Sequence, residues 1–439
     1  MFFVELLVVL LALCLGARLG GIFIGMAAGL GLGILIFIFG LPPSSPPVDV
    51  MLIIMAVVLA ASTLQASGGM DYLVKIAEKI LRKNPNRISF VAPMVAYAFT
   101  FLSGTGNVAF SILPVIAEVA RESGVRPERP MSISVIASQQ AITASPISAA
   151  MAALIALLAP FGVSMGSIMI ICIPATLIGI IAGSFYACRV GKELADDPEY
   201  MRRLQQGLIK PTKPLDATQP EPSGKAKLSV ALFILGAVII VLMGTIPALR
   251  PDFIVDGATI KLSMTHTIEI IMFIVSAVMV LLCKPDLDKI VSGSVFKAGT
   301  MGVICIFGLA WMGDTLVTNN MPFIKTNVQD IVTAHPWMFA LGLFFVSALT
   351  LSQAATTRLL IPLGIGLGLP PYAMVASWPA VNGYFFIPSY ATLIAGVSFD
   401  TTGTTKIGKY VFNHSYMIPG LITTFVGVCV GFIIATFVF

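Results

Sequence analysis

The sequence FLSGTGNV at residues 101–108 interrupts an apolar region with a run of small and polar residues. Apolar residues dominate the 15 positions before this run (88–102) and the 13 positions from 108 to 120. A helix of 15 residues rises roughly 22 Å, less than the roughly 30 Å of bilayer hydrocarbon. Neither arm crosses a membrane alone, so the pair predicts a re-entrant hairpin with its tip, residues 103–107, near the midplane. Backbone at that depth is tolerated only inside protein or beside a polar cavity, which makes the tip a candidate binding site.

Composition predicts an all-α polytopic membrane protein. Hydrophobic residues make up 57% of the 439 residues and charged residues 11%, with a mean hydropathy of +0.96, whereas soluble domains carry about 25% charged residues. Six scattered cysteines without CxxC spacing indicate buried apolar positions rather than disulfides. The three histidines form no ligand motif, and no HExxH or similar catalytic set is present. We therefore expect no enzyme activity, no cofactor and no nucleic-acid partner.

One order of elements occurs twice along the chain. We expect a first repeat at 1–188 with its hairpin at 88–120, a linker at 189–227 that is partly disordered, and a second repeat at 228–439 with its hairpin at 336–369. Each repeat has five crossing spans, an amphipathic or mixed segment (72–82 and 319–335) and one span broken at proline (131–158 and 372–397). The other spans are 2–17, 21–39, 50–67, 163–188, 228–249, 264–283, 298–318 and 416–439. Glycines at every fourth position of 21–39 (Gly21, Gly25, Gly29 and Gly33) predict close helix packing.

The basic residues predict the orientation. A hairpin crosses zero times, so each repeat crosses five times and the second is inverted relative to the first. With the N-terminus outside, 22 Lys and Arg lie in inside loops, and only Arg250, Lys261 and Lys325 lie outside. The positive-inside rule then places both termini in the periplasm and the linker in the cytoplasm. The first hairpin enters from the cytoplasm, the second enters from outside, and their tips meet.

Inverted repeats with broken helices at the midplane are typical of secondary transporters. A returning half-helix begins near Asn107, Ser145, Thr356 and Ser389, and each N-terminus offers free N–H groups and a positive dipole end. This arrangement suits a small anion. The candidate substrate-binding residues are Ser103, Gly104, Thr105, Gly106, Asn107, Gln139, Thr143, Ser145, Ser352, Gln353, Thr356, Thr357, Arg358, Asn382, Tyr384 and Ser389. Carbonyl groups at the opposite half-helix ends, near Asn107 and Thr143, offer a site for Na⁺, and the coupling ion is Na⁺ or H⁺.

Arg358 and Asp314 are charged residues inside predicted membrane segments. Arg358 follows the second tip by one turn, where a buried guanidinium is costly and marks a functional position. A bidentate contact with a substrate carboxylate would offset that cost, and a partner within the protein or a water-filled position are the alternatives. Asp314 is interpreted as a satisfied polar contact, with cation or proton coupling as the alternative.

The chain resembles the anaerobic C4-dicarboxylate transporters, the Dcu family (DcuA/DcuB type) of bacterial inner membranes, nearly from end to end. The resemblance is carried by these runs: 16–21 (GARLGG), 68–73 (GGMDYL), 103–107 (SGTGN), 113–120 (LPVIAEVA), 141–150 (AITASPISAA), 352–355 (SQAA) and 403–408 (GTTKIG). Residues 297–299 with 311–315 (WMGDT) resemble the DcuA-like branch associated with aspartate and fumarate uptake.

This resemblance implies exchange or uptake of fumarate, malate, aspartate and succinate. It also implies the ion-transporter fold of two inverted repeats with one hairpin each, usually as a homodimer in the lipid bilayer. We expect alternating access of the elevator type, in which the hairpins and broken spans move against the first spans of each half. The alternatives are a citrate or sulfate carrier of the same architecture, a channel, and a transporter that doubles as a sensor kinase partner through the loop containing Asp400 and Lys406.

Overall fold

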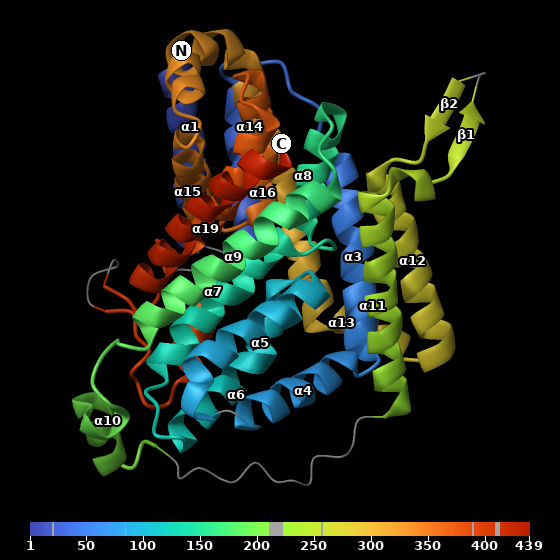
Figure 1. Ribbon diagram of the computed structural model, residues 1–439. Helices are drawn as coiled ribbons and strands as arrows, with labels where there is room; N and C mark the ends of the chain where they lie inside the picture. The colour runs from blue at the N-terminus through green and yellow to red at the C-terminus, as the bar shows by residue number, and fades with distance from the viewer. Residues whose placement is uncertain (20–21, 84, 210–222, 256–257, 389, 409–412) are drawn as a thin grey trace.

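The computed structural model describes residues 1–19, 22–83, 85–209, 223–255, 258–388, 390–408 and 413–439 (Figure 1). The first part of the chain forms α1 (Phe2–Leu19), α2 (Phe23–Phe37), α3 (Val48–Ala66), α4 (Gly69–Lys83), η1 (Pro85–Arg87), α5 (Ile88–Ser103), η2 (Gly106–Val108), α6 (Ala109–Glu122), α7 (Glu128–Ala144), α8 (Ala149–Leu158), η3 (Ala159–Phe161), α9 (Met165–Ala187), η4 (Leu194–Asp196) and α10 (Pro198–Gln205), where η denotes a 3₁₀ helix. The second part forms α11 (Gly224–Thr245), η5 (Pro247–Leu249), β1 (Asp252–Val255), β2 (Ala258–Lys261), α12 (Met264–Cys283), α13 (Leu287–Ser292), α14 (Ser294–Ala334), α15 (Met338–Thr350), α16 (Gln353–Gly366), α17 (Pro371–Ser377), η6 (Trp378–Phe385), α18 (Ala391–Phe399) and α19 (Met417–Val438). The two strands pair antiparallel, with Asp252 opposite Lys261.

The expected class, a polytopic helical membrane protein, is confirmed. Over the described residues, six helical segments are long and apolar enough to cross a membrane, and the α3–α4 pair, bent by 72°, raises the number to seven when it counts as one span. The six are Glu128–Phe161, Met165–Ala187, Gly224–Thr245, Met264–Cys283, Ser294–Ile324 and Met417–Val438. Four apolar helices are shorter, and two of these, Ile88–Ser103 and Met338–Thr350, are the first arms of the predicted hairpins.

Pairs of short helices occupy the positions of the two predicted hairpins. α5 packs against α6 and α15 packs against α16, and each pair is joined by a tight connection rather than a loop (Figure 1). Both broken spans form too. α7 ends at Ala144 and α8 begins at Ala149, where Pro146 lies between them and the hydroxyl of Ser148 caps α8 by accepting from the Met151 N–H. The second break is longer, because η6 winds as a 3₁₀ helix between α17 and α18.

The structure differs from the sequence-based expectation in two places, the segment 319–335 and the glycine series, and adds detail in the linker. The mixed segment 319–335 is continuous with its span, so that α14 is one helix of 41 residues with Pro322 inside it. The linker is partly ordered: α10 and η4 lie within it, while residues 210–222 lie outside the described residues. The glycines of 21–39 do not all pack closely. An added Cβ at Gly25 would lie 2.4 Å from the Ile304 carbonyl oxygen, as expected for close packing, but an added Cβ at Gly29 would meet nothing within 4 Å.

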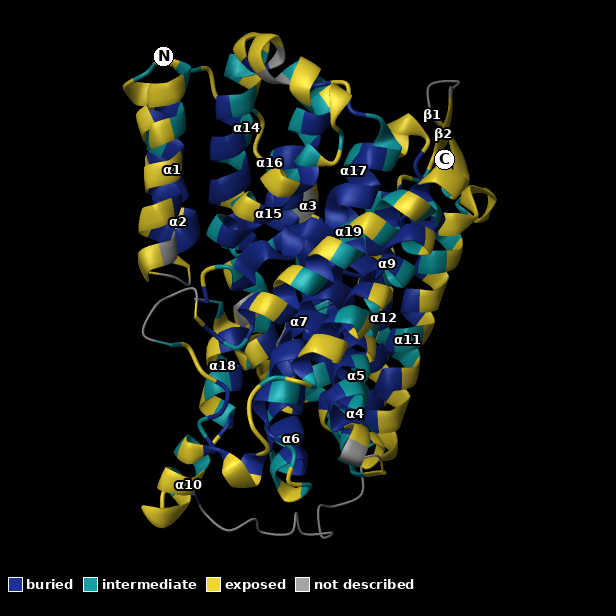
Figure 2. Ribbon diagram, turned by 60° about the vertical axis from the view of Figure 1, so that its left-hand side comes forward, coloured by how far each residue is buried: buried dark blue, intermediate teal, exposed yellow. Residues whose placement is uncertain are grey.

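α7 and α8 lie at the centre of the molecule. In the most apolar stretch of α7 and α8, 83% of the residues are buried. In the corresponding stretch of α19 only 28% are buried, and this helix presents exposed residues outward (Figure 2). The amphipathic α4 turns away from α3 at one end of the molecule, near α6 and α10, and the two chain termini lie toward the other end (Figures 1 and 2). The broken α7–α8 span is therefore the element that the hairpins and outer helices surround.

Candidate binding site

A cavity of about 480 Å³ lies where the two hairpin tips meet. It is lined by Ser103, Gly104, Thr105 and Gly106 of the first tip and by Thr350, Leu351, Ser352, Gln353 and Ala354 of the second. Phe110, Ile142, Ala149, Ala150, Tyr390 and Ala391 complete one side, and Ile24, Ile54, Val57, Val58, Ala61, Val295, Gly299, Met301, Gly302, Cys305 and Ile306 form the other. Residues more than 240 positions apart in the sequence thus share one cavity, as predicted for the tips.

The first tip is shaped by close contact. α5 ends at Gly104, which has φ +68° and whose N–H donates to the Thr100 carbonyl at 2.8 Å. A Cβ at Gly104 would lie 2.7 Å from the Ile147 carbonyl oxygen, and a Cβ at Gly106 would lie 2.5 Å from Nε2 of Gln139. Only glycine combines a left-handed conformation with such close approach, as at Gly104. Gly104 therefore lets the tip backbone lie against Ile147 in the break between α7 and α8, and Gly106 lets it lie against Gln139 of α7.

The second tip is shaped by side chains. α15 ends at Leu351, which also has a left-handed conformation (φ +52°), and Ser352 caps α16 by accepting from the Ala355 N–H at 3.2 Å. The hydroxyls of Thr350 and Thr356 lie 2.7 Å apart and bridge the two arms. Hydroxyl groups therefore hold the conformation of the second tip, whereas glycines allow the conformation of the first.

Four helix beginnings surround the cavity: Gly106 of η2, Ala149 of α8, Gln353 of α16 and Ala391 of α18 each contribute a lining residue. The described lining residues include no Lys, Arg, His, Asp or Glu. Helix N-termini carry partial positive charge and free N–H donors, so the neutral cavity is suited to an anion. Two beginnings differ from the prediction by a turn or less, with α8 starting at Ala149 rather than near Ser145, and α16 starting at Gln353 rather than near Thr356.

A buried amide network lies behind the tips. Nε2 of Gln353 donates to Oε1 of Gln139 at 3.0 Å and to Oδ1 of Asn382 at 3.1 Å, and Nδ2 of Asn382 donates to Oε1 of Gln140 at 3.1 Å. Gln140 in turn donates to Thr424 of α19 at 3.3 Å. Buried amides are costly unless bonded, so this network fixes α16, α7 and η6 relative to one another.

The predicted site residues fall into three groups. Ser103, Gly104, Thr105, Gly106, Ser352 and Gln353 line the cavity. Gln139, Thr143, Ser145, Thr356, Thr357, Asn382 and Tyr384 are buried beside it, where hydrogen bonds within the protein occupy most of them. The side chain of Asn107 and the whole of Ser389 lie outside the described residues.

Arg358 differs from the other predicted site residues, because it neither lines the cavity nor is fully buried. Its side chain is half-buried on α16, and its Nε is buried without a hydrogen-bond partner among the described residues. The guanidinium acts electrostatically on the carboxylate of Asp314, on α14. No ion pair within 4 Å joins Arg358 to Asp314 among the described residues, so the alternatives for Arg358 stay open.

Two parts of the cavity were not predicted from the sequence: the wall made by α3 and α14, and the aromatic residue Tyr390. The centre of the Tyr390 ring lies 4.9 Å from that of Tyr384. The predicted residue Tyr384 therefore supports Tyr390, which lines the cavity. Gly302 lines the cavity, and an added Cβ there would meet nothing within 4 Å. The small residues Gly299, Gly302 and Cys305 at helical spacing were the available signal for this face.

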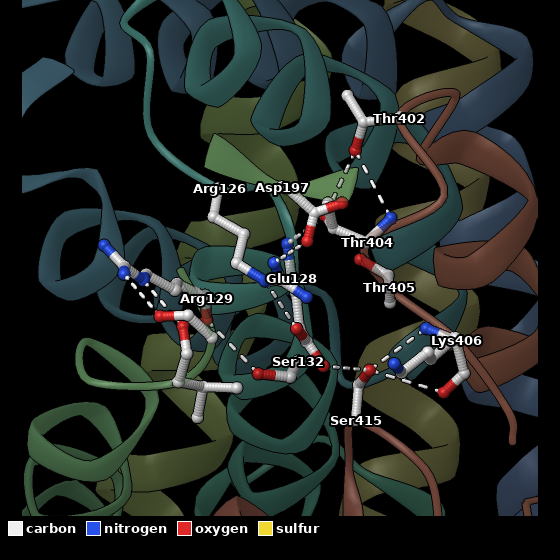
Figure 3. Close-up of polar contacts among 12 residues, drawn as sticks. Arg126, Glu128, Arg129, Ser132, Asp197, Thr402, Thr404, Thr405, Lys406 and Ser415 are labelled. Atoms are coloured by element: carbon white, nitrogen blue, oxygen red, sulfur yellow. Dashed lines mark hydrogen bonds and ion pairs between the residues drawn. The ribbon is translucent and has the colours of Figure 1, made fainter. Parts of the chain in front are cut away.

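A second polar cluster, the linker cluster, lies at the α10 end of the molecule (Figure 3). The buried guanidinium of Arg126 bonds to Glu128 at 2.7 Å and to Asp197, which precedes α10. Glu128 also accepts from the Ser415 hydroxyl at 2.6 Å, and its N–H donates to the Thr404 hydroxyl at 3.2 Å. The linker is thereby joined to the start of α7 and to the loop before α19.

The charges in the linker cluster stabilise one another. Burial alone would raise the pKa of Asp197, but the Tyr200 N–H and the Arg126 guanidinium outweigh burial and lower that pKa. Burial lowers the pKa of the nearby His414 to about 4, so this imidazole is neutral at pH 7. These paired and neutral groups make the cluster a structural junction rather than a second anion site.

Comparison with known proteins gives consistent matches. Residues 1–439 match the family described as anaerobic C4-dicarboxylate membrane transporter. The chain is 45% identical over 438 residues to the C4-dicarboxylate transporter DcuA of Escherichia coli K12, with all of both chains covered, and 44% identical over 431 residues to that of Wolinella succinogenes, with 98% of each covered. It is 38% identical over 446 residues to the anaerobic C4-dicarboxylate transporter DcuB of Escherichia coli O6:H1, with 99% of this chain and 98% of the relative covered.

A solved structure of MtrF from Neisseria gonorrhoeae, described with a class of antimetabolite efflux pumps, matches with a TM-score of 0.52. The match covers 92% of this chain and 84% of that chain at 10% identity. At this identity the likeness shows a shared fold alone.

Proposed function

The chain belongs to the anaerobic C4-dicarboxylate membrane transporter family, and on that premise we propose that one four-carbon dicarboxylate binds between the two hairpin tips and crosses the membrane by alternating access. The family consists of transporters rather than enzymes, and the chain is a C4-dicarboxylate transporter. The substrates we propose are fumarate, succinate, malate and aspartate, with exchange of one for another as the main reaction.

The observation that carries this proposal is the neutral cavity ringed by four helix beginnings. A dicarboxylate is a dianion at pH 7, and N–H donors at helix N-termini bind anions without any ionised side chain. The hydroxyls of Ser103, Thr105 and Ser352 and the amide of Gln353 line the same space. The apolar wall of Val57, Val58 and Ile306 suits the carbon chain between the carboxylates.

The remaining candidate residues have supporting roles in this proposal. Gln139, Thr143, Ser145, Thr356, Thr357, Asn382 and Tyr384 position the tips, and Asn107 and Ser389 complete the site. A coupling cation, Na⁺ or H⁺, is held near Asn107 and Thr143.

For the movement, we propose an elevator built from two inverted repeats, 1–188 and 228–439. Hydrogen bonding supports a division into two bodies. Gln353 of α16 bonds to α7 and η6, whereas Trp311 and Thr315 of α14 bond to the loop at Ser44. The hairpins and broken spans would form the moving body, and α1, α2, α3 and α14 the scaffold.

We further propose that the protein lies in the bacterial inner membrane with both termini in the periplasm and the linker in the cytoplasm. The excess of basic residues in loops of one side supports this orientation, as does the placement of the termini and α10 toward opposite ends (Figures 1 and 2). The open Gly29 face of α2 fits a homodimer contact. The exposed Lys406 beside the buried Asp400 leaves a loop that a sensor kinase partner would be able to reach.

Counterflow in proteoliposomes tests the proposal. We expect internal fumarate to drive uptake of radiolabelled aspartate or fumarate, with succinate and malate competing and with citrate and sulfate failing to compete. Running the assay with and without a Na⁺ gradient decides the coupling ion. Competition by citrate or sulfate as strong as that by succinate would favour the alternative anion carrier, and unsaturable flux would indicate a channel.

A further inference from the structure

The seam between α14 and α16 lies beside the cavity, toward the end of the molecule that carries the chain termini. On α14 the cavity is lined up to Ile306, and Gly313 and Asp314 follow about two turns later, roughly 12 Å along the axis. On α16 the cavity is lined by Gln353 and Ala354, and Arg358 follows about one turn later. The seam is therefore the next layer of protein that a substrate meets on this side of the cavity.

The two helices contact each other closely in that layer. A Cβ on Gly313 would lie 1.6 Å from Cδ1 of Leu359, so the leucine side chain fills the space that glycine leaves. Among the described residues, no hydrogen bond joins α14 to α16. Such a contact between an apolar side chain and a glycine separates without breaking any polar bond.

Hydrogen bonds hold the two helices to different neighbours. On α14, Nε1 of Trp311 donates to the Ser44 carbonyl at 2.6 Å, and Asn320 donates to Glu5 of α1 at 2.7 Å. On α16, Gln353 bonds to Gln139 and the Thr357 hydroxyl accepts from Trp378 at 2.8 Å. When the two bodies move, α14 and α16 therefore separate or slide along this seam.

Two opposite charges lie on either side of the seam, because the contact of Gly313 with Leu359 brings their chain neighbours Asp314 and Arg358 close, although no ion pair within 4 Å joins the two among the described residues. Arg358 and Asp314 are both half-buried, and Arg358 is the charged group that acts on Asp314 among the described residues. Nε of Arg358 is buried without a hydrogen-bond partner among the described residues, so the guanidinium retains a free donor. Opposite charges attract more strongly where little water screens them, so moving Arg358 away from Asp314 opposes separation of the helices unless another anion reaches Arg358.

We propose that Asp314 and Arg358 form an electrostatic gate on the terminus side of the cavity. With the gate closed, Asp314 neutralises Arg358 and α16 lies against α14. With the gate open, a substrate carboxylate replaces Asp314 beside Arg358. This proposal rests on the proposed function, and it assigns Arg358 to the path of the substrate rather than to its resting site.

The gate gives a physical reason for exchange. An empty carrier that opens leaves both Asp314 and Arg358 without a partner, whereas a carrier that opens toward a dicarboxylate offers Arg358 a new one. The equilibrium shifts toward the open form only by the difference in affinity for the anion between the two forms. The gate residues are therefore positioning residues that couple opening to the presence of substrate.

A thiol at Gly302 reports directly on the gate. Gly302 lines the cavity with open space around its missing Cβ, so Gly302→Cys directs a thiol into the cavity. The six native cysteines are replaced by serine or alanine in the full-length protein, and a membrane-impermeant maleimide is applied from the terminus side of oriented vesicles. The rate of labelling then measures how often the cavity opens to that side.

We expect Asp314→Asn and Arg358→Gln each to raise the labelling rate about tenfold by shifting the closed–open equilibrium. The double variant Asp314→Arg with Arg358→Asp restores slow labelling, because the pair is re-formed with opposite polarity. Asp330→Asn, which removes an exposed carboxylate from the same helix, leaves the rate unchanged. In liposomes, Asp314→Asn raises the ratio of uptake into empty vesicles to uptake into substrate-loaded vesicles.

The gate is refuted if both single variants label within twofold of the parent, or if the charge-reversed pair labels as fast as the single variants. Protection of the Gly302→Cys thiol by fumarate in the parent separately tests the proposed site. If fumarate fails to protect the thiol but the gate variants still change the labelling rate, the proposed site is wrong and the gate stands. If fumarate protects the thiol but the variants leave the labelling rate unchanged, the gate is wrong and the site stands.

Discussion

The two hairpin tips have the same backbone turn and different means of holding it. The first arm of each hairpin ends in a left-handed residue, Gly104 with φ +68° and Leu351 with φ +52°. At the first tip a Cβ would collide with the backbone of Ile147, so the conformation is set by space. At the second tip the turn is followed by the Ser352 cap and the bond between Thr350 and Thr356, so it is set by hydroxyl groups.

This difference indicates different mechanical roles. Close backbone contact, as at Gly104, has one arrangement, and a shift of a few tenths of an ångström creates a collision. Hydroxyl bonds such as that of Thr350 exchange partners with water or with an anion at small net cost. The first tip is therefore suited to be a fixed floor of the site, and the second to rearrange around the substrate.

The largest effect is expected from Gly104→Ala. The new Cβ enters a 2.7 Å contact with the Ile147 carbonyl, and the left-handed conformation costs an L-residue about 1–2 kcal/mol before any backbone displacement. We expect counterflow to fall about 100-fold or more, together with a fall in the thermal unfolding temperature of the detergent-solubilised protein, since overpacking adds about 1–3 kcal/mol.

Gly162→Ala is the matched control for that variant. Gly162 has φ +79°, and a Cβ there would meet nothing within 4 Å. Gly162→Ala therefore has the same backbone penalty as Gly104→Ala, but its new Cβ collides with nothing. Equal losses in the two variants would show that conformation rather than contact matters at Gly104, and the comparison between the tips would then fail.

A smaller effect is expected from Gln353→Met. The thioether keeps the length of the side chain and removes the amide that donates to Gln139 and Asn382. Two buried carbonyl oxygens then lack a donor, at about 1–3 kcal/mol each. We expect the KM for fumarate to rise about 10- to 100-fold in counterflow.

The same exchange at Gln205, exposed on α10, is the control and is expected to leave the KM for fumarate unchanged. An unaltered KM in Gln353→Met would mean that the network behind the second tip does not contribute to binding.

A still smaller effect is expected from Ser352→Ala, which removes the cap of α16. Loss of a serine cap costs about 0.5–2 kcal/mol, typically near 1. Because this helix beginning faces the cavity, we expect the KM for fumarate to rise about fivefold. Ser164→Ala removes the cap of α9 and its reciprocal bond with Ser167, away from the cavity. That control lowers the unfolding temperature by a similar amount and leaves the KM unchanged.

The sequence was sufficient for the membrane class, the two hairpin arms and the tips. The signals were local: arms such as Ile88–Ser103 are too short to cross, and glycines at 104 and 106 permit only a turn with close approach. The break at Pro146 and the amphipathic face of α4 are local in the same sense. These features were predictable because chain length and residue type determine them without reference to other helices.

The rest depended on packing between distant elements. Arg358 was assigned to the substrate because a buried charge needs a partner, but Asp314 is separated from it by 44 positions and is brought near by the contact of Gly313 with Leu359. Tyr390 lines the cavity without any local pattern that distinguishes it from a packing residue, and the spacing of Gly299, Gly302 and Cys305 indicates a close-packed face without indicating a cavity. The linker was expected to be partly disordered, but its chain pattern did not indicate that the buried pair of Arg126 with Asp197 joins α10 to the start of α7.

The smallest effect is expected from Leu351→Gly, which gives the second tip the residue type of the first. Glycine relieves about 1–2 kcal/mol of left-handed strain. It also adds about 0.5–1 kcal/mol of backbone entropy in the unfolded chain and removes the part of the leucine side chain that packs beside the cavity. These contributions oppose one another, so the unfolding temperature and the KM for fumarate should change little, the KM by less than about threefold. Leu351→Gly adds a glycine at one tip and Gly104→Ala removes a glycine at the other, and the same unfolding and counterflow assays measure both variants. A loss in Leu351→Gly as large as that in Gly104→Ala would mean that shape fixes both tips, and the second tip would then no longer be the part that rearranges around the substrate.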